Sequence, residues 1–444
     1  MNKKFLSMLI LAAVVFTTTA CGQKKEEPEA TPEEAREEVS DYSQLSMKQL
    51  EVLTYEQDGE AAYYLGLHYD YGTEDVPQNF SKAFDWYMKA IEYGEMRGNI
   101  GIGYLYLNGC GVEADLDAAA DFFTAAVDAD LPEGYVGLAR IAMLQYEEEV
   151  GSYNLTAWDD MENALYLETN PIILPEEEDE KDKEKDEEAT APTQPEAPTV
   201  SVKDTPEYAA LQEKIASAGE TYGSDIYDNL KIAYDAGNLD AMFYMGYIQE
   251  RGIGVERDLD AAVKKYQAVA KNTSDKIWDQ YAINSAHTRL GILYMGGKWF
   301  APDEAMALEQ FQIAADNGYA MAQYYMGILY QMGLGVDRDY ETALNWFELA
   351  TSQDYAPAIC QMGYIYFNGL GVDANYGQAA YYQKLAAAQG YVPAQINLGY
   401  MYENGYGVDQ NLETALAYYK LAETSGYEGV SEAIARVELL LKDM

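Results

Sequence analysis

The sequence predicts an all-α solenoid in which short antiparallel helix pairs stack side by side. A pattern of alanine, glycine and aromatic residues returns every 36 residues in the C-terminal half of the chain. Each copy holds two stretches with apolar residues at helical spacing, separated by a Gly-x-Gly-Val element. The chain has 444 residues, of which 48% are apolar, so it can bury a core and exceeds one ordinary domain.

Residues 1–21 are predicted to be a targeting segment. Two lysines precede an apolar run from Phe5 to Phe16, which is too short to span a bilayer comfortably. The next cysteine, Cys21, follows Ala20 as in a bacterial lipobox, which this segment resembles. That resemblance implies a lipid on Cys21 and a place on the extracytoplasmic face of a bacterial cell membrane. An ordinary signal peptide with a chance cysteine is the alternative.

Two further segments have compositions that cannot bury a core. Residues 22–44 are rich in Glu, Lys, Pro and Thr and are predicted to be a disordered tether. Residues 171–204 combine a run of charges with a Pro- and Thr-rich stretch, which indicates a flexible linker. A lone charged helix over Glu176–Glu188 is the alternative. The linker would separate a first array of repeats, 45–170, from a second array, 205–444.

One well-formed copy of the repeat begins at Ala322. Its first helix, helix A, carries Gly327 in the middle, where glycine costs about 1 kcal/mol relative to alanine. The same position is glycine in successive copies, which indicates that a partner helix approaches closely there. Gly-x-Gly-Val then ends helix A, because glycine adopts the left-handed conformation of a helix C-cap. Asp339 is predicted to cap the second helix, helix B, which carries alanine and aromatic residues three or four apart.

The glycine in the middle of helix A, here called the key glycine, marks each copy. The seven copies have Gly66, Gly103, Gly246, Gly291, Gly327, Gly363 and Gly399. A weaker copy has Ala139 at this position. Residues Tyr208–Ala236 are predicted to form a degenerate opening repeat of the second array, and Gly429–Lys442 a terminal capping helix.

This pattern resembles the Sel-one-like repeat (SLR) family, relatives of the tetratricopeptide repeat (TPR) with a longer loop between the two helices. The resemblance covers about 320 residues. It implies an α-α superhelical solenoid of about seven to nine helix pairs, here in two arrays. It also implies an adaptor that binds other proteins.

The resemblance further implies a binding groove lined by the A helices. By analogy with TPR solenoids, residues three before, one after and four after the key glycine should face this groove. Aromatic residues at these positions suit peptide recognition, because tyrosine offers apolar area and a hydroxyl at low entropic cost. The candidate groove residues are Tyr63, Tyr104, Phe243, Tyr247, Tyr324, Tyr364, Phe367 and Tyr400. Packing between adjacent repeats is the alternative for the tyrosines that directly follow the key glycine.

The same analogy places polar residues in the groove at the position four after the key glycine. These residues are Asp70, Glu250, Gln331 and Glu403.

The composition argues against several classes of function. A formal net charge of −46 is unsuited to binding a nucleic-acid backbone. His68 and His287 have no second ligand at metal-binding spacing, and Cys110 and Cys360 form no CxxC motif. The sequence contains no dinucleotide-binding, phosphate-loop, nucleophile-elbow or zinc-protease motif. We therefore expect no enzyme, no cofactor and no metal.

The protein is predicted to be a membrane-anchored adaptor that binds protein or peptide ligands and acts in envelope signalling or regulation. A surface receptor for glycan or peptidoglycan fragments, with exposed tyrosines as stacking platforms, is the alternative. Residues 45–170 hold 5 basic and 24 acidic residues, a net charge of −19, so a basic partner would be steered to this array.

Overall fold

The computed structural model describes residues 41–72, 76–150, 206–274, 277–296, 302–424 and 428–442. In these ranges the chain forms 18 α-helices, two short 3₁₀ helices and no strand. The predicted all-α fold is therefore confirmed. The predicted targeting segment with Cys21, nearly all of the predicted tether and the whole of the predicted linker lie outside the described residues.

The chain divides into two compact units. The first comprises Met1–Tyr146 and Gly219–His287, and the second comprises Glu147–Ala218 and Thr288–Met444. The first unit thus combines helices from both of the arrays that the sequence suggested. The divisions fall within three helices, α7, α10 and α13, whose bounds are given below.

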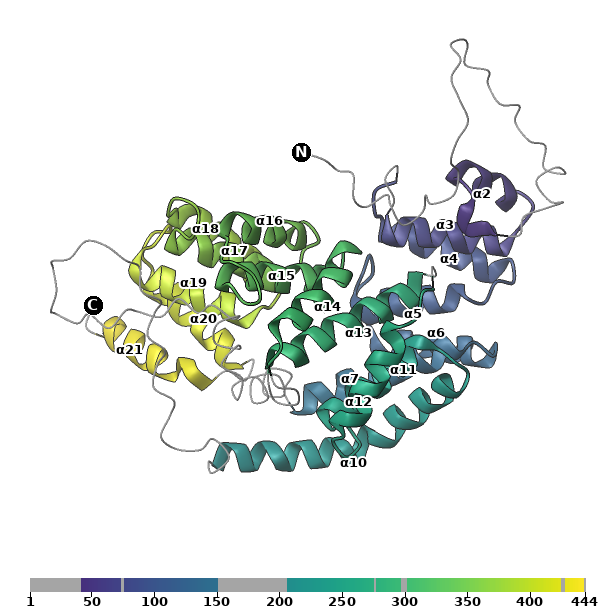
Figure 1. The fold of residues 1–444 in the computed structure, drawn as a ribbon, viewed down its shortest axis with the longest axis horizontal. Helices are drawn as coiled ribbons and strands as arrows, with labels where there is room; N and C mark the ends of the chain where they lie inside the picture. The colour runs from purple at the N-terminus through teal and green to yellow at the C-terminus, as the bar shows by residue number, and fades with distance from the viewer. Residues whose placement is uncertain are drawn as a thin grey trace, which may run out of the picture. The chain divides into compact units, whose positions relative to one another are not determined.

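The helices follow one another in pairs, as Figure 1 shows by colour and label. The N-terminal elements are η1 (Tyr42–Gln44), α2 (Met47–Thr54), α3 (Gly59–Tyr71), α4 (Phe80–Glu92), α5 (Gly98–Asn108), α6 (Leu116–Asp128) and α7 (Pro132–Val150). After the linker come α10 (Pro206–Asp235), α11 (Leu239–Arg251), α12 (Leu259–Ala270) and α13 (Ile277–Gly296). The remaining elements are α14 (Glu304–Asp316), α15 (Ala320–Met332), α16 (Tyr340–Thr351), α17 (Ala356–Asn368), α18 (Tyr376–Ala388), α19 (Val392–Asn404), α20 (Leu412–Thr424), η3 (Glu428–Val430) and α21 (Ser431–Lys442).

The ends of the helices have the predicted caps. Asp339 accepts hydrogen bonds from the backbone N–H groups of Glu341 and Thr342 at the start of α16. Other B helices begin with Asn79, Asp115, Asp258, Asp303 and Asn375, whose side chains cap in the same way. Five A helices end on a left-handed glycine with φ between 67° and 75°, namely Gly109, Gly252, Gly333, Gly369 and Gly405. Local chemistry thus sets the length of each helix.

The key glycines let helix B lie directly on helix A. A Cβ atom on Gly327 would lie 2.5 Å from the ring of Phe347 in α16. The key glycines Gly66, Gly103, Gly246, Gly291 and Gly399 meet the rings of Tyr87, Phe123, Tyr266, Phe311 and Tyr419 in the same way. These five rings and Phe347 are almost completely buried. The predicted close approach of the partner helix is therefore correct.

The second glycine of Gly-x-Gly-Val joins one repeat to the one before it. A Cβ on Gly371 would lie 2.4 Å from Cβ of Tyr340, the first residue of α16. Gly111, Gly335 and Gly407 likewise meet Phe80, Glu304 and Tyr376, each the first residue of a preceding B helix. A side chain at these positions would push neighbouring repeats apart, which the sequence pattern did not reveal.

Helices α7 and α10 together form one repeat that residues 151–205 interrupt. Ile226, Leu230 and Ala233 of α10 are fully buried and have the spacing of Ala343, Phe347 and Ala350 in α16. Gly254 meets Gly223 of α10, as the other second glycines meet a B helix. Val136 of α7 packs in one cluster with Ala233 and with Ala241 of α11. The second half of α10 is therefore the helix B that follows α7.

This arrangement corrects the prediction for Tyr208–Ala236. That segment is not an opening repeat with two helices, because it lies within the single 30-residue helix α10. The terminal helix expected over Gly429–Lys442 is present as α21, where Ile434 and Val437 pack in one cluster with Tyr419. The last repeat thus has its end covered.

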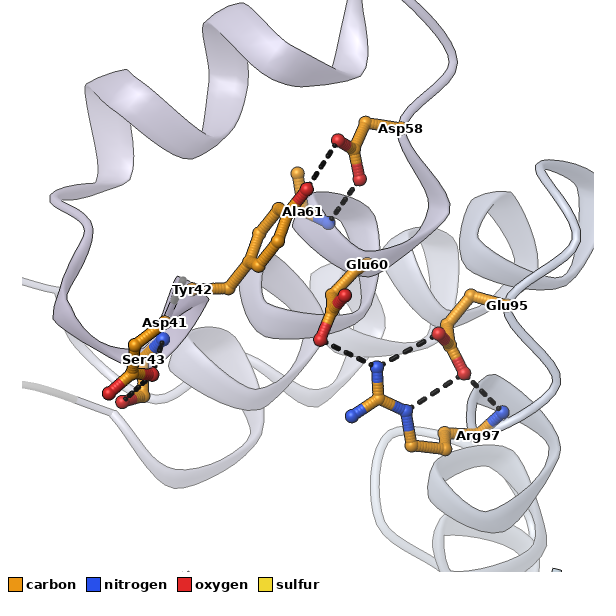
Figure 2. A network of polar contacts seen from close by, with 8 residues as sticks. All are labelled: Asp41, Tyr42, Ser43, Asp58, Glu60, Ala61, Glu95 and Arg97. Atoms are coloured by element: carbon orange, nitrogen blue, oxygen red, sulfur yellow. Dashed lines mark hydrogen bonds and ion pairs between the residues drawn. The ribbon is translucent and has the colours of Figure 1, made fainter. Parts of the chain in front are cut away.

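The N-terminal end of the first repeat is held by polar contacts (Figure 2). The Tyr42 hydroxyl of η1 donates a 2.8 Å hydrogen bond to Asp58, which also caps α3. Arg97 forms ion pairs with Glu60 at 3.0 Å and with Glu95 at 2.8 Å. These contacts tie η1, α3 and the start of α5 together.

Candidate protein-binding surfaces

Four of the eight candidate groove residues are buried. Tyr63, Tyr104, Phe243 and Tyr324 expose 4%, 9%, 7% and 4% of their surface. Their rings lie 5.0–6.0 Å from the rings of Tyr87, Phe123, Tyr266 and Phe347, respectively. The expectation that these four side chains are exposed in a groove is corrected: they pack on the aromatic ring that the key glycine admits. Tyr63, Phe243 and Tyr324 lie three residues before a key glycine, so that position is a core position, whereas Tyr104 directly follows Gly103.

The other four candidates, Tyr247, Tyr364, Phe367 and Tyr400, are half-buried. Two of them, Phe367 and Tyr400, form a cluster with Tyr376 and Tyr406 in the second unit. The ring centroids of Phe367 and Tyr376 are 4.9 Å apart, and those of Phe367 and Tyr406 are 5.4 Å apart. Tyr376 exposes 43% of its surface. We call these four residues the aromatic edge, because they come from helix ends and a loop of two adjacent repeats.

The acids four residues after the key glycine have internal partners. Asp70, Glu250 and Glu403 accept hydrogen bonds of 2.9, 2.7 and 2.9 Å from the hydroxyls of Tyr87, Tyr266 and Tyr419. Repeats with phenylalanine in that B-helix position have Leu107, Met295 or Gln331 instead of an acid. A buried hydroxyl requires an acceptor, so each repeat supplies one when its ring is tyrosine. The expectation that Glu250 and Glu403 face an open groove is wrong, because both are buried.

A second cluster of tyrosines lies within the first unit and comes from A helices. We define the inner tyrosine cluster as Tyr71 (α3), Tyr104 (α5), Tyr244 (α11) and Tyr281 (α13). The guanidinium carbon of Arg140, in α7, lies 4.9 Å from the ring centroid of Tyr104 and 5.7 Å from that of Tyr244. Burial raises the pKa of Tyr104 to about 12. Arg140 therefore joins rings from two repeats on either side of α7.

Two members of the inner tyrosine cluster are accessible to solvent. Tyr71 exposes 42% of its surface, and Tyr281 exposes 51%. Desolvation nevertheless raises the pKa of Tyr71 well above 10, with further contributions from Asp70, Tyr63 and Tyr104. Tyr71 is therefore in contact both with water and with other groups of the protein.

Asp240, near the start of α11, interacts electrostatically with Arg140 and with Tyr71 of the inner tyrosine cluster. Its Oδ1 atom is buried and has no hydrogen-bond partner among the described residues. Desolvation raises the pKa of Asp240 to about 6, Arg140 lowers it, and Asp279 and Glu133 raise it. Asp240 thus brings an unsatisfied acceptor to a site with three carboxylates and one guanidinium.

Sequence reasoning missed Arg140 and Asp240 for different reasons. Arg140 directly follows Ala139, so it occupies a predicted groove position in the weaker copy of the repeat. It was not a candidate, because the candidates were aromatic residues of the seven well-formed copies. Asp240 lies six residues before Gly246 and outside the three predicted positions. No repeat signal marks it, because its environment depends on residues from α7 and α13.

Among the described residues, no helix combines the length and apolar character needed to cross a membrane. The described part of the chain also brings no three His, Cys, Asp or Glu side chains together as a metal site. Cys110 and Cys360 are free thiols, and burial raises the pKa of Cys360 to about 12.

Comparison with solved structures finds several similar chains. A Sel1 repeat protein from Oxalobacter formigenes is 20% identical, with 95% of this chain and 98% of that chain covered and a TM-score of 0.43. The protein c5321, a protective antigen of uropathogenic Escherichia coli strains with an SLR fold, is 20% identical, with coverages of 89% and 90% and a TM-score of 0.26. The immunity protein Pa5087 from Pseudomonas aeruginosa is 16% identical, with coverages of 76% and 83% and a TM-score of 0.27. No curated protein matches the chain.

The Sel1 repeat family model matches seven segments that together make up more than half of the chain. They are residues 59–94, 98–131, 239–267, 284–319, 320–355, 356–391 and 392–427. The repeat formed by α7 and α10 is not among them, because residues 151–205 separate its two helices. The chain belongs to the Sel1 repeat family, whose helical repeats serve as scaffolds for protein–protein interactions.

Proposed function

We propose that this protein is a membrane-anchored extracytoplasmic adaptor that binds a protein or peptide ligand through its repeats, in envelope signalling or regulation. The family supports the scaffold role. The Ala20-Cys21 sequence after an apolar run supports the lipid anchor. The acidic composition supports a partner other than nucleic acid.

The aromatic edge is the observation that carries the ligand-binding proposal. Its four rings come from two adjacent repeats and remain half-buried or exposed. Clustered surface aromatics are typical of interaction sites, since each ring supplies a large apolar area with little loss of entropy. Tyr364, also half-buried, packs in the same cluster as Phe367 and Tyr400.

The ring orientations support a peptide ligand more than a sugar ring. Phe367 and Tyr406 meet at 86°, Phe367 and Tyr376 at 56°, and Tyr400 and Tyr406 at 32°. Tilted rings form an uneven surface that suits side chains, whereas a sugar stacks on a flat face.

Capture of the partner from the source cells tests the proposal. The full chain would be crosslinked at the cell surface and its bound proteins identified. We expect a specific partner whose recovery falls at least tenfold with Tyr400→Ala or Tyr364→Ala. Tyr381→Ala is the matched control, because Tyr381 is a 56% exposed tyrosine on a B helix outside the aromatic edge. Equal recovery from all variants, or binding to purified cell wall alone, would reject the proposal.

The lipid anchor has a separate test. With Cys21→Ala the protein should leave the membrane fraction, because the lipidated residue is lost. Cys110→Ala is the control, since Cys110 lies within the first repeat array. Retention of the Cys21→Ala protein in washed membranes would show that another element anchors it.

A further inference from the structure

We infer that the inner tyrosine cluster binds a lysine or arginine side chain of the protein ligand, with Asp240 as its counter-ion. This inference rests on the proposed function, because it assigns the chemistry of part of the ligand. Asp240, Arg140 and the tyrosines all belong to the first unit.

The unsatisfied oxygen of Asp240 favours a donor. A buried carboxylate oxygen without a hydrogen bond is unfavourable, because desolvation of the charge is not offset. Asn238, two residues earlier, already caps the backbone of α11 through Ala241. Asp240 is therefore not needed for that cap, and a ligand ammonium or guanidinium would supply what its carboxylate lacks.

The charge balance favours a cation over an anion. Asp279 and Glu133 act electrostatically on Asp240 as like charges, and Arg140 acts on it as the opposite charge. The guanidinium of Arg140 already lies against two rings. Three carboxylates and one guanidinium leave a net negative charge when all are ionised, so an anionic ligand would be repelled. Residues 45–146, which belong to this unit, hold 5 basic and 17 acidic residues, and their net charge of −12 has the same sign and would steer a basic segment toward it.

The tyrosine rings provide suitable walls for such a cation. Lysine and arginine bind over tyrosine faces with about 0.5–2 kcal/mol, more where water is excluded. The cluster already holds Arg140 in this way. Tyr71 and Tyr281 have 42% and 51% of their surfaces accessible, so a ligand side chain can reach them.

Peptide binding to the full chain tests the inference. The probe is a fluorescein-labelled ten-residue peptide of alternating lysine and serine, and the comparison peptide carries acetylated lysines. Anisotropy is measured at pH 7.5 in 150 mM salt, which weakens long-range attraction. We expect the acetylated peptide to bind at least tenfold more weakly, and Asp240→Asn to weaken binding of the lysine peptide about tenfold.

Asp260→Asn is the matched control. Asp240 and Asp260 both follow a leucine at the start of a helix, but Asp260 is exposed. Both variants remove one charge, so a general effect of net charge would weaken binding equally. A second readout is the pH dependence of binding. Binding should weaken below about pH 6, where Asp240 takes up a proton. Arg140 opposes this protonation, and Asp279 and Glu133 favour it.

Equal affinities for wild type, Asp240→Asn and Asp260→Asn would overturn the inference, as would equal binding of the acetylated peptide. Thermal unfolding of Asp240→Asn shows that the variant is folded. If Asp240→Asn has no effect while Tyr400→Ala still abolishes partner capture, the inference fails and the proposed function stands. If partner capture itself fails, the proposed function is rejected independently of the peptide result.

Discussion

At the scale of the residue, the key glycines decide whether helix A and helix B can touch. Gly327 lies within an A helix, where alanine would be favoured by about 1 kcal/mol on helix propensity alone. The ring of Phe347 occupies the space that a Cβ would need. Packing therefore outweighs propensity at this position.

Gly327→Ala should lower the free energy of unfolding by about 1–3 kcal/mol, because the added methyl overpacks the helix interface. Urea denaturation measures the change. Gly219→Ala should instead raise stability by up to about 1 kcal/mol, since Gly219 lies in α10 with open space around it. Stabilisation by Gly327→Ala would contradict the packing argument, and Phe347→Leu in the same chain should recover part of the loss.

Asp240 makes the stability of the first unit depend on pH. Its pKa is raised from 3.8 to about 6, so folding favours the protonated carboxyl. The stabilisation is fully present below pH 4 and is lost as pH rises through 6. We therefore expect the free energy of unfolding of Asp240→Asn, measured relative to wild type, to be higher at pH 8 than at pH 4. The change in this difference should be at most about 3 kcal/mol.

Calorimetry at pH 4, 6 and 8 checks this dependence. The pKa of Asp70 is also raised to about 6, but Asp70 is present in both proteins and cancels in the difference. A constant difference between wild type and Asp240→Asn across this range would show that the carboxyl is not desolvated in the folded state.

At the scale of the element, α21 is attached to the last repeat by one buried acid. Glu403 is 7% exposed and accepts two hydrogen bonds from Arg436, at 2.7 and 2.9 Å. The Tyr419 hydroxyl donates a third. A buried carboxylate with three donors is satisfied, so α21 completes the polar core as well as covering apolar side chains.

Arg436→Ala should destabilise the C-terminal end by about 1–3 kcal/mol, because Glu403 keeps its burial and loses its counter-ion. Hydrogen exchange of α21 and α20 would show the loss locally. Lys420→Ala removes an exposed ion pair between α20 and Glu438 of α21 and should change stability by less than about 1 kcal/mol. Equal effects of the two substitutions would refute the role assigned to Glu403.

At the scale of the whole molecule, the repeat built from α7 and α10 joins chain segments on both sides of residues 151–205. A protease site inserted near residue 190, followed by cleavage, should leave the two fragments associated in gel filtration. The shared core of Val136, Ala233 and Ala241 would hold them together. Val136→Asp is the control that should weaken this association. Separation of the cleaved wild-type fragments would show instead that the two arrays are independent.

The repeat, its two helices, their caps and the close contact at the key glycine could all be predicted from the sequence. These features depend on residues within about 20 positions, such as Gly327 and Phe347, so one repeat contains the necessary information. The first glycine of Gly-x-Gly-Val also acts within its own repeat, because it ends helix A. The second glycine is required by its contact with helix B of the preceding repeat, which lies outside the repeat that contains it.

The tertiary structure alone decided which aromatic residues are accessible and which helices complete one another. Tyr324 is buried because the ring of Phe347 lies beside it, whereas Tyr376 is exposed at the edge of two repeats. The partnership of α7 with α10 spans a segment of unrelated composition, so periodicity is lost there. The charge environment of Asp240 in α11 is set by side chains from α7 and α13, and it forms only when these helices pack.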